Sequence, residues 1–434
     1  MTHNAKVKRL VADFKRAKGS VSLAKKTSHL FRPLEKTAHR LQVEDFCDVL
    51  SVKDGVVDVE GMASIEQTVT ETLKYGYMPR VSMELKHITV GGATCGVGIE
   101  SSSFKYGLFH QNVTEMEILT PKGEVIVCTP TKNSDLFYGI PNSYGTLGYI
   151  LRLKIKLKKV KKYVHLEYLH YNRQDKFLTD YKELSDSKQK HDFIEGLVYS
   201  PKSFVVSIGT FVDEAPYSND YTHMKSYYKS VEERNEDYLE TGHFIFRWDP
   251  DWFWGSKGNI FGFAPFRLIF GKWLLNSANY MKYLRLEQKY KIREKFPMIW
   301  PDKLESLIQD ILIPKENLSE YLKFLITKIQ IFPIWLCAVD AVPSFKLFPT
   351  KKNMYVDFGF WSARPLKASD PGYWNKLVES KTREEKGVKS LYSDVFYEEK
   401  DFWKNTDKAY YDKLKAKYDP DHRLKNLYEK TITR

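Results

Sequence analysis

A dense run of glycines is the part of this chain whose residue types point most clearly to chemistry. Five glycines lie among small and hydroxyl-bearing residues between Thr89 and Phe109. Glycine lets another molecule approach the main chain closely, and successive N–H groups beside hydroxyls suit a pyrophosphate or the edge of a flavin ring. The run matches neither the GxxxxGK[ST] phosphate loop nor the GxGxxG fingerprint of a nucleotide-binding helix. It therefore predicts a ligand-binding loop of another kind.

The bulk composition indicates a large globular protein. The chain has 434 residues, of which 42% are hydrophobic and 15% aromatic, so two or three domains with substantial cores are expected. Basic residues outnumber acidic ones by 68 to 55, which gives a formal net charge of +13. Such a balance favours anionic partners such as a phosphate-bearing cofactor or an anionic membrane surface.

The densest basic stretch, residues 152–162, favours a strand rather than a nucleic-acid surface. Its apolar and basic residues alternate with a period of two, which predicts a strand with one solvated face whose charges protect it from pairing. No helix–turn–helix, zinc-finger or RNP pattern accompanies the lysines. We therefore expect no nucleic-acid partner.

The cysteines indicate whether a metal site is expected, and the apolar runs indicate where in the cell the protein is expected. The four cysteines form no CxxC or Cys/His cluster, so we expect no metal site and no disulfide framework. The N-terminus lacks a signal peptide, and no apolar run has the length of a transmembrane helix. Residues 260–275, aromatic and aliphatic with two basic residues, fit a membrane interface, a buried helix or the lining of an apolar pocket. We expect a cytoplasmic or peripherally membrane-associated protein.

The periodicities alternate between helix and strand without regular βαβ spacing. Helices are predicted at residues 5–18 and 62–76, and hairpins at 52–59 and 113–130. A glycine turn at Gly145 leads into a long strand, and further strand-like runs occupy 193–200 and 203–212. This arrangement predicts an α+β fold, with a second domain from about residue 161.

Ordered sequence blocks carry a resemblance to a known family. The segment 89–109 resembles the FAD-binding segment of the delta-24 sterol reductases, which are flavoproteins of the vanillyl-alcohol-oxidase type. Further similar blocks follow in order: CTPTKNSDLFY (128–138), GTLG (145–148), KKYV (161–164), DFIEGLVYS (192–200), DILIP (310–314), FPIWLC (332–337) and LYSDVFY (391–397). Residues 213–300 match poorly, and Phe104 stands where a histidine commonly follows the serine triplet.

The resemblance implies a vanillyl-alcohol-oxidase-type FAD-binding domain made of two α+β subdomains, with an α+β cap domain. The FAD-binding domain would span residues 1–160 and be completed by about 385–434, and the cap would span 161–384. The FAD would be noncovalent, because His29 lacks the RGGGH context of covalently flavinylated relatives. The implied FAD-binding residues are Lys26, Thr27, Ser28, Thr89, Val90, Gly91, Gly92, Ala93, Thr94, Cys95, Gly96, Val97, Gly98, Ile99, Glu100, Ser101, Ser102, Gly145, Thr146 and Gly148.

The resemblance also implies NADPH-dependent reduction of a C=C bond in the side chain of a sterol or related isoprenoid lipid. Such a reduction needs a proton donor as well as a hydride, and the candidates are Tyr106, His110, Glu195 and Tyr397. Phe332, Trp335 and Trp361 are candidates for an apolar pocket or for plain core. Two alternatives stay open: an FAD-dependent oxidase or dehydrogenase of an alcohol or polyprenyl sugar, and a flavin-fold binding protein without turnover.

Overall fold

The computed structural model of the protein describes residues 1–25, 31, 37–257, 262–290, 295, 303–351 and 353–433. Helices, strands and contacts are given for these residues. None of their helices is both long and apolar enough to cross a membrane.

An antiparallel sheet of several short strands and one long strand forms the first half of the molecule. In the described residues it has the order β3-β4-β8-β6-β7, with β5 paired to β8, and every pairing is antiparallel. Its buried side includes Val57, Ile118 and Ile155, which share a hydrophobic core with Val69 of helix α2 (Ile65–Leu73). Its strands are β3 (Val49–Lys53), β4 (Val56–Glu60), β5 (Tyr77–Pro79), β6 (Val113–Leu119), β7 (Val125–Cys128) and β8 (Tyr149–Lys159).

Several helices and a small strand pair accompany this sheet. Ser64 caps α2 in a capping box with Gln67, which explains why the helix starts there. The strands β1 and β2 pair in parallel beside α1. The elements are α1 (His3–Arg16), β1 (Val21–Ala24), β2 (His39–Gln42), α2 (Ile65–Leu73), α3 (Val90–Gly96), α4 (Ser103–Tyr106) and α5 (Ser134–Gly139).

A larger antiparallel sheet forms the second half. Its order within the described part of the protein is β12-β9-β11-β10-β14-β15-β13-β16. The strands are β9 (Tyr163–Tyr171), β10 (Phe193–Ser200), β11 (Ser203–Val212), β12 (Glu236–Glu240), β13 (Leu304–Pro314), β14 (Ile334–Ala341), β15 (Asn353–Pro365) and β16 (Val388–Lys389).

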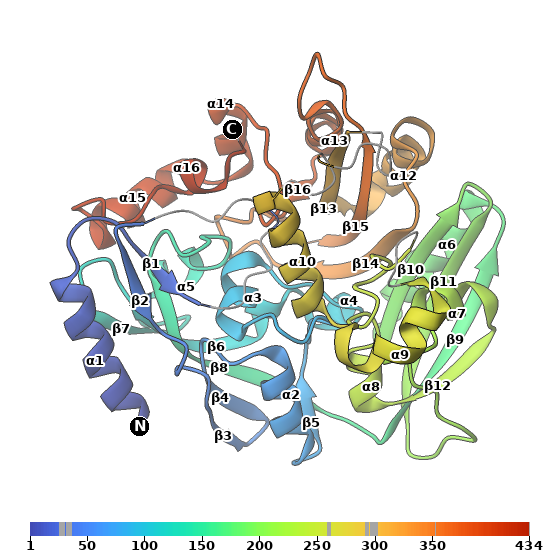
Figure 1. Cartoon of the computed structure of the whole chain (residues 1–434), viewed down its shortest axis with the longest axis horizontal. Coiled ribbons are helices and arrows are strands. Elements are labelled where there is room, and N and C mark those ends of the chain that lie inside the picture. The colour runs from blue at the N-terminus through green and yellow to red at the C-terminus, as the bar shows by residue number, and fades with distance from the viewer. Residues whose placement is uncertain are drawn as a thin grey trace.

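Three helices cover the outer face of the second sheet, and the glycine-rich region covers its inner face. Phe177, Tyr321 and Val378, one from each of the three helices, share a core with Ile194 and Phe358 of the sheet. Figure 1 shows α3 and α4 at the centre of the molecule, between the two sheets. The covering helices are α6 (Gln174–Asp186), α12 (Leu318–Phe324) and α13 (Tyr373–Glu384).

The remaining helices lie on either side of this centre. A helical segment between β11 and β13 lies on the face turned toward the viewer in Figure 1, and the C-terminal helices return to the first half. Tyr410 of α15 donates a hydrogen bond to the carbonyl oxygen of Asp135 in α5 at 2.6 Å. The helices are α7 (Tyr227–Glu233), α8 (Thr241–Ile245), α9 (Ala264–Leu274), α10 (Ser277–Tyr290), α14 (Glu399–Phe402), α15 (Lys408–Tyr418) and α16 (Leu427–Thr431).

The α+β prediction is confirmed, and two local expectations are corrected. The glycine-rich stretch was expected to be a loop, but residues 90–96 form α3, because Thr89 caps the helix and the glycines allow close packing. The basic strand β8 is present, but it is central, between β4 and β6, so its charges do not protect a sheet edge. Arg152 and Lys154 instead pair with acidic residues of the neighbouring strands, Asp58 and Glu115.

The domain boundary near residue 160 stays a prediction; β8 of one sheet ends at 159 and β9 of the other begins at 163.

Candidate active site

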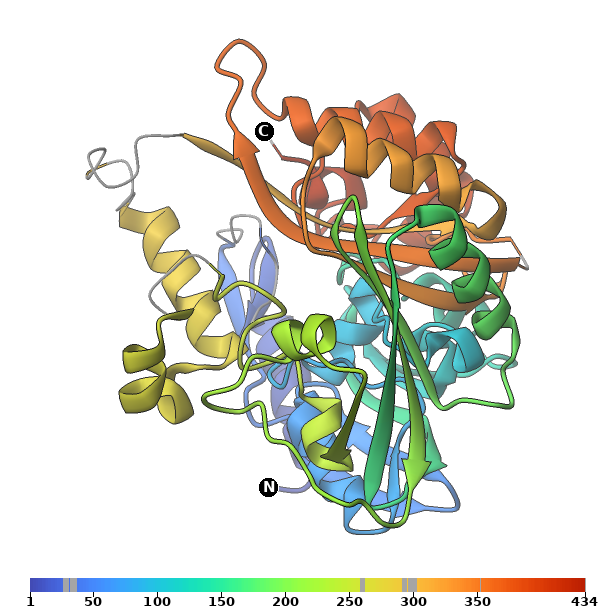
Figure 2. The same ribbon diagram turned by 90° about the vertical axis from the view of Figure 1, so that its right-hand side faces the viewer.

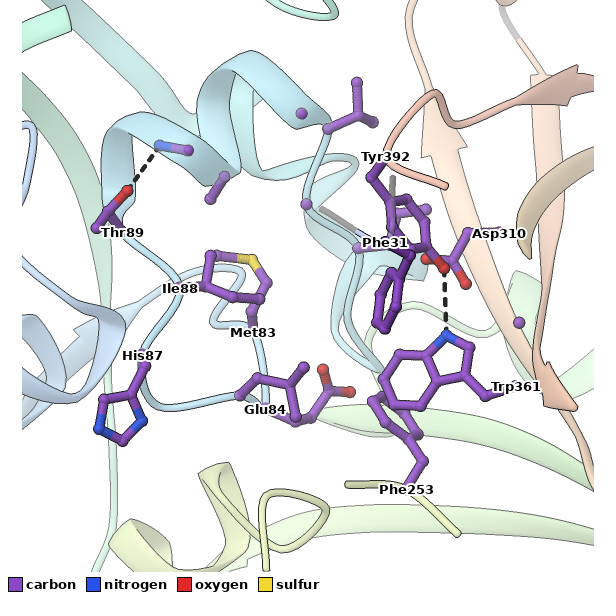
Figure 3. Close-up of a pocket in the computed structure, with 18 of the residues that line it drawn as sticks. Phe31, Met83, Glu84, His87, Ile88, Thr89, Phe253, Asp310, Trp361 and Tyr392 are labelled. Carbon is purple, nitrogen blue, oxygen red and sulfur yellow. Dashed lines mark hydrogen bonds between the residues drawn. The ribbon is translucent and has the colours of Figure 1, made fainter. Parts of the chain in front are cut away.

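A cavity of about 240 Å³ lies between α3 and the inner face of the second sheet. One wall is formed by α3 and the segments on either side of it, within residues 83–99. The other wall is aromatic and includes Phe31, Phe253, Trp254, Trp335, Trp361 and Tyr392. Figure 3 shows the two walls facing each other, with Met83, Ile88 and Thr89 on one side and Phe31, Trp361 and Tyr392 on the other. The cavity is slightly smaller than the range of about 300–1,000 Å³ usual for small-molecule sites.

Two glycines of α3 leave its backbone open to the cavity. Thr89 caps the helix by accepting a hydrogen bond from the N–H of Gly92 at 3.1 Å. A side chain at Gly96 would meet only the ring of Tyr144, at 3.7 Å or more, which is ordinary van der Waals contact. Gly92 and Gly96 both line the cavity, so a flat ligand has access to the peptide groups here.

Two other glycines of the same stretch have a packing role. A Cβ atom at Gly91 would stand 2.7 Å from the carbonyl oxygen of Gly61, and one at Gly98 would stand 2.5 Å from Sδ of Met83. Gly91 is buried and does not line the cavity. The glycine run therefore serves two purposes, close packing of α3 on the end of β4 and an open backbone toward the cavity.

The aromatic wall is held in place by hydrogen bonds at its polar edges. Phe253 packs edge-on against Trp361 with ring centroids 4.0 Å apart. The indole N–H of Trp254 donates to the carbonyl oxygen of Trp361 at 2.8 Å, and that of Trp335 donates to Glu195 at 2.9 Å. Because the indole donors are satisfied outside the cavity, the ring faces that line it offer an apolar surface.

A protonatable pair interrupts this apolar wall. Tyr392 accepts a hydrogen bond from the indole N–H of Trp361 at 3.2 Å and is hydrogen-bonded to the carboxyl group of Asp310. Burial raises the pKa of Asp310 to about 7, although the bond from Tyr392 lowers it. Gly359 faces Asp310 across the β13–β15 ladder, and a Cβ there would come 2.9 Å from the carboxyl oxygen. Burial and the neighbouring Asp310 also raise the pKa of Asp357 well above its ordinary range.

The opposite wall carries ionisable groups of its own. Glu84 is buried, and its Oε1 atom has no hydrogen-bond partner among the described residues. Burial, followed by the charge of Glu100, raises the pKa of Glu84 well above its ordinary range. His87 and Lys25 also line the cavity, and burial lowers the pKa of Lys25. The cavity thus contains protonatable groups on both sides.

A buried ion cluster lies just behind the cavity. Arg247, which follows α8, contacts Glu195 of β10 at 2.9 Å and Glu100 of the glycine-rich segment at 3.4 Å. Tyr227 adds a hydrogen bond to Glu195 at 3.1 Å. The guanidinium group therefore ties together carboxylates from both halves of the molecule. Glu195, a predicted proton donor, is engaged in this cluster and does not line the cavity.

The other three predicted proton donors also lie away from the cavity. Tyr106 is half-buried, with Lys158 5.5 Å from its ring centroid. His110 is fully buried against Phe345, and neither ring nitrogen has a partner within the described part of the protein; burial lowers its pKa to about 3. Tyr397 lines a separate small pocket beside Phe402. The structure therefore does not bring the four candidates together, and their role stays a prediction.

The predicted cofactor residues divide into those that line the cavity and those that support it. The lining residues are Thr89, Gly92, Ala93, Cys95, Gly96, Val97, Gly98 and Ile99. Those of residues 89–102 that do not line it are Val90, Gly91, Thr94, Glu100, Ser101 and Ser102, all of them buried. Lys26, Thr27 and Ser28, together with His29, lie outside the described residues.

The predicted turn at residues 145–148 is held by local structure. Gly145 and Gly148 have φ angles of +75° and +141°, and Thr146 donates a hydrogen bond to the carbonyl oxygen of Ser143 at 2.8 Å. Lys415 of α15 donates to the carbonyl oxygen of Thr146 at 3.0 Å. None of these three predicted residues lines the cavity.

Sequence reasoning missed the carboxyl and phenol groups that do line the cavity. Asp310 begins the block DILIP and Tyr392 lies in the block LYSDVFY, both of which carried the resemblance. Their presence in matching blocks was the available signal. Glu84 lies just before the glycine-rich stretch, where nothing in the sequence marks it. Of the aromatic candidates, Trp335 and Trp361 line the cavity, whereas Phe332 packs in the core behind the second sheet.

Comparisons with known proteins bear directly on this site. The FAD binding domain family matches residues 1–129, which include α3 and one wall of the cavity. The chain is 30% identical over 413 residues to the Delta(24)-sterol reductase of Homo sapiens, with 91% of this chain and 78% of the relative covered. The chain belongs to the Delta(24)-sterol reductase family. The homolog of Caenorhabditis elegans is 25% identical over 433 residues, with 93% and 81% covered, and the Arabidopsis thaliana enzyme is 26% identical over 445 residues, with 91% and 77% covered.

As a member of the Delta(24)-sterol reductase family, the protein is an FAD-binding oxidoreductase. The residues of the cavity fit such a cofactor. Gly92 and Gly96 line the cavity, with open space beside Gly96 in particular, and the buried polar atoms Glu84 Oε1 and His87 Nδ1 have no partner among the described residues. If FAD binds in this cavity, the lining residues of 89–99 would hold its planar ring against α3.

Proposed function

We propose that this protein reduces a C=C bond in the side chain of a sterol or related isoprenoid lipid, using FAD with NADPH as the electron donor. The observation that carries the proposal is a cavity between the glycine-rich helix and an aromatic wall that contains the Asp310–Tyr392 pair. Membership of the Delta(24)-sterol reductase family supports the same reaction.

The aromatic wall supports an apolar substrate. Trp254, Trp335 and Trp361 offer ring faces, and each indole N–H already has a protein acceptor, so an aliphatic group can bind without leaving these donors unpaired. A substrate with several hydroxyl groups, such as a sugar, would find few partners on this wall. The apolar wall therefore suits an aliphatic reacting group, as the lipid-reductase proposal requires, better than the sugar group of the polyprenyl-sugar oxidase alternative.

The proposed chemistry divides hydride and proton between the two walls. Bound FAD supplies the hydride. The isolated C=C bond also needs a proton, because its carbons carry little charge before protonation begins. Asp310 is placed to give that proton through the hydroxyl of Tyr392, and Trp361 fixes the hydroxyl by its indole N–H.

The electrostatics of the pair suit a proton donor at neutral pH. A pKa of about 7 leaves Asp310 protonated in a substantial fraction of molecules near neutrality. Burial and the charge of Asp310 raise the pKa of Asp357 well above its ordinary range, so ionisation of both carboxyl groups together is disfavoured. The pair can release and recover a proton within each cycle, which is the property that a general acid needs.

We also propose that the FAD-binding domain spans residues 1–160 and is completed by residues 385–434, with residues 161–384 as the cap. The packing of α15 on α5 and the hydrogen bonds of Tyr144 support this division. The hydroxyl of Tyr144 donates to the carbonyl oxygen of Gly96 at 3.2 Å and accepts from the N–H of Leu391 at 2.9 Å. These bonds fasten the C-terminal segment to the end of α3.

Product analysis tests the proposed reaction. Purified protein loaded with FAD is incubated with NADPH and a sterol that carries a C=C bond in its side chain, and the product is examined by mass spectrometry. The proposal predicts a product that has gained one hydride and one proton at that bond. Oxidation of an alcohol or polyprenyl sugar without NADPH would favour the oxidase, and FAD binding with no turnover of any substrate would favour the binding protein.

A further inference from the structure

The outer side of helices α9 and α10 exposes large apolar side chains to solvent. Trp273 is 75% exposed, Ile269 71%, Leu268 65% and Phe263, which precedes α9, 62%. Isolated exposed apolar residues are normal on soluble proteins, but a contiguous group of this kind marks an interaction surface. We call these residues, together with those of α10 named below, the apolar face.

Helix α10 continues the apolar face. Tyr283, Leu286 and Tyr290 are exposed and follow one another at spacings of three and four residues. This spacing places them on one side of the helix. Figure 2 shows the two helices, in olive and gold, projecting at the left-hand edge of the molecule, so the face is not overhung by the sheets.

The inner side of the same helices is fastened to the body of the protein. Arg267 of α9 forms a buried ion pair with Asp251 at 2.5 Å. The hydroxyl of Ser277 at the start of α10 donates to Asp249 at 2.6 Å, and Tyr280 stacks on Trp252 with ring centroids 5.4 Å apart. The orientation of α9 and α10 is thus fixed by specific contacts, and their apolar side is left facing outward.

The charges around the apolar face suit an anionic surface. Residues 262–290 contain five basic residues and one acidic residue; one of the basic residues, Arg267, is buried in its ion pair with Asp251, which leaves four. Lys282 and Lys289 of α10 are exposed beside the apolar residues. A helix with aromatic and aliphatic residues on one side and basic residues beside them is typical of binding in the headgroup region of a membrane. Basic side chains near anionic lipids add to the binding, and the net charge of +13 acts in the same direction.

The apolar face is also joined to the aromatic wall of the cavity. Trp252, on which Tyr280 of α10 stacks, packs in turn against Phe31 with centroids 5.5 Å apart and against Trp361 at 5.7 Å. Phe31 and Trp361 line the cavity. A continuous aromatic layer therefore runs from the cavity to α10.

We propose that the apolar face of α9 and α10 docks this protein on an anionic membrane surface, with its side chains in the headgroup region. Docking in this way holds the aromatic wall of the cavity next to the bilayer. The proposed function, on which this step rests, makes the substrate a membrane lipid, and such a substrate reaches the cavity from the bilayer. The docking itself is independent of the reaction.

Vesicle co-sedimentation with the full-length, FAD-loaded protein tests the proposal. The vesicles consist of phosphatidylcholine alone or of phosphatidylcholine with phosphatidylserine, and no substrate or NADPH is present. Three double variants are compared with the wild type: Ile269→Ser with Trp273→Ser, Lys282→Glu with Lys289→Glu, and Leu50→Ser with Tyr75→Ser. Leu50 and Tyr75 are exposed apolar residues beside the first sheet, and serve as the matched control.

The wild type and the Leu50/Tyr75 control are expected to sediment with the anionic vesicles and to bind neutral vesicles more weakly. The Ile269/Trp273 variant and the Lys282/Lys289 variant should each reduce the bound fraction at limiting lipid by about tenfold or more, with unchanged FAD content. Equal binding by the wild type and the Ile269/Trp273 variant would overturn the proposal, as would no binding by the wild type. A dimer in solution that the same variant dissociates, without any effect on vesicle binding, would instead assign the face to a second copy of the protein.

Discussion

At the scale of single residues, Asp310 and Tyr392 set the site apart from an ordinary apolar pocket. Asp310 shares the pocket with aromatic rings, and burial raises its pKa to about 7. Glu84 on the opposite wall is the competing donor, with a pKa raised well above its ordinary range. We favour Asp310 because Tyr392 and Trp361 connect it to the cavity by hydrogen bonds and because its pKa lies near neutrality.

Asp310→Asn is expected to slow the reduction of the sterol by about 10²–10⁴-fold, the usual contribution of a general acid. Reduction of the bound flavin by NADPH should stay within about threefold of wild type, because that step needs no proton from Asp310. Stopped-flow spectroscopy separates the two steps. The exposed carboxylate Asp213 provides a control in Asp213→Asn, which should leave both rates unchanged.

The variant Glu84→Gln tests whether the proton comes from Glu84 or from Asp310, which lie on opposite walls of the cavity. If Asp310 is the donor, this variant should change the rate of sterol reduction by less than about tenfold, with its pH profile preserved. A loss as large as that expected for Asp310→Asn, together with a near-normal Asp310→Asn enzyme, would move the proton donor to Glu84.

The raised pKa of Asp310 also predicts two pH dependences. The sterol step of the wild type should fall as pH rises above about 7, because the acid form of Asp310 is lost. For stability the sign follows from linkage: the folded pKa lies above the ordinary value of about 3.9, so the folded state loses stability as pH rises from about 4 to 7. Asp310→Asn removes that loss, and above pH 7 its free energy of unfolding in urea should equal or exceed that of the wild type. A less stable variant at pH 8 would contradict the assigned pKa shift.

At the scale of elements, α3 shows what the sequence could and could not reveal. The density of glycine marked a stretch that lines the cavity, but glycine is a poor helix former and the stretch was predicted to be a loop. Packing overrode propensity, because Gly91 lets α3 approach the backbone of Gly61 and Thr89 caps the helix. The helices and hairpins of the first half were predictable because their periodicity and their capping and turn residues are local.

Substitutions within α3 separate the two roles of its glycines. Gly91→Ala should lower the free energy of unfolding by several kcal/mol, because the new Cβ would stand 2.7 Å from a backbone oxygen. Gly96→Ala has space for a Cβ and removes a flexible residue from a helix, so stability should be unchanged or rise by up to about 1 kcal/mol. Its affinity for FAD should nevertheless fall. Urea unfolding of the apoprotein and fluorescence titration with FAD measure the two effects, and normal FAD affinity in Gly96→Ala would contradict the placement of FAD against α3.

At the scale of the whole molecule, long-range pairing assembles the site. Asp310 and Tyr392 lie far apart in the sequence and meet because β13 sits between β15 and β16 in the second sheet. This strand order does not follow from local periodicity, so the sequence indicated that these residues belong to family blocks but not that they share a cavity. Arg247 likewise joins Glu100 and Glu195 from separate parts of the sequence, and no motif marks it.

Arg247→Met should be strongly destabilising, because it leaves Glu100 and Glu195 buried without their cation. Removal of one partner from a buried ion pair costs about 3–5 kcal/mol, and denaturation in urea measures it. The exposed pair of Arg9 and Asp45 offers a control, since Arg9→Met should cost about 1 kcal/mol or less. Adding Glu195→Gln to Arg247→Met should recover part of the loss; if it does not, the cluster is not the link between the two halves.

The most direct test of the central claim follows the bound flavin through both halves of one catalytic cycle, without oxygen. Purified protein loaded with FAD is mixed first with NADPH and then with a sterol whose side chain has a C=C bond, while flavin absorbance is recorded. The account predicts that NADPH bleaches the flavin and that the sterol restores its colour with formation of the saturated product. A flavin that NADPH leaves oxidised, or a reduced flavin that such a sterol does not reoxidise, would contradict it.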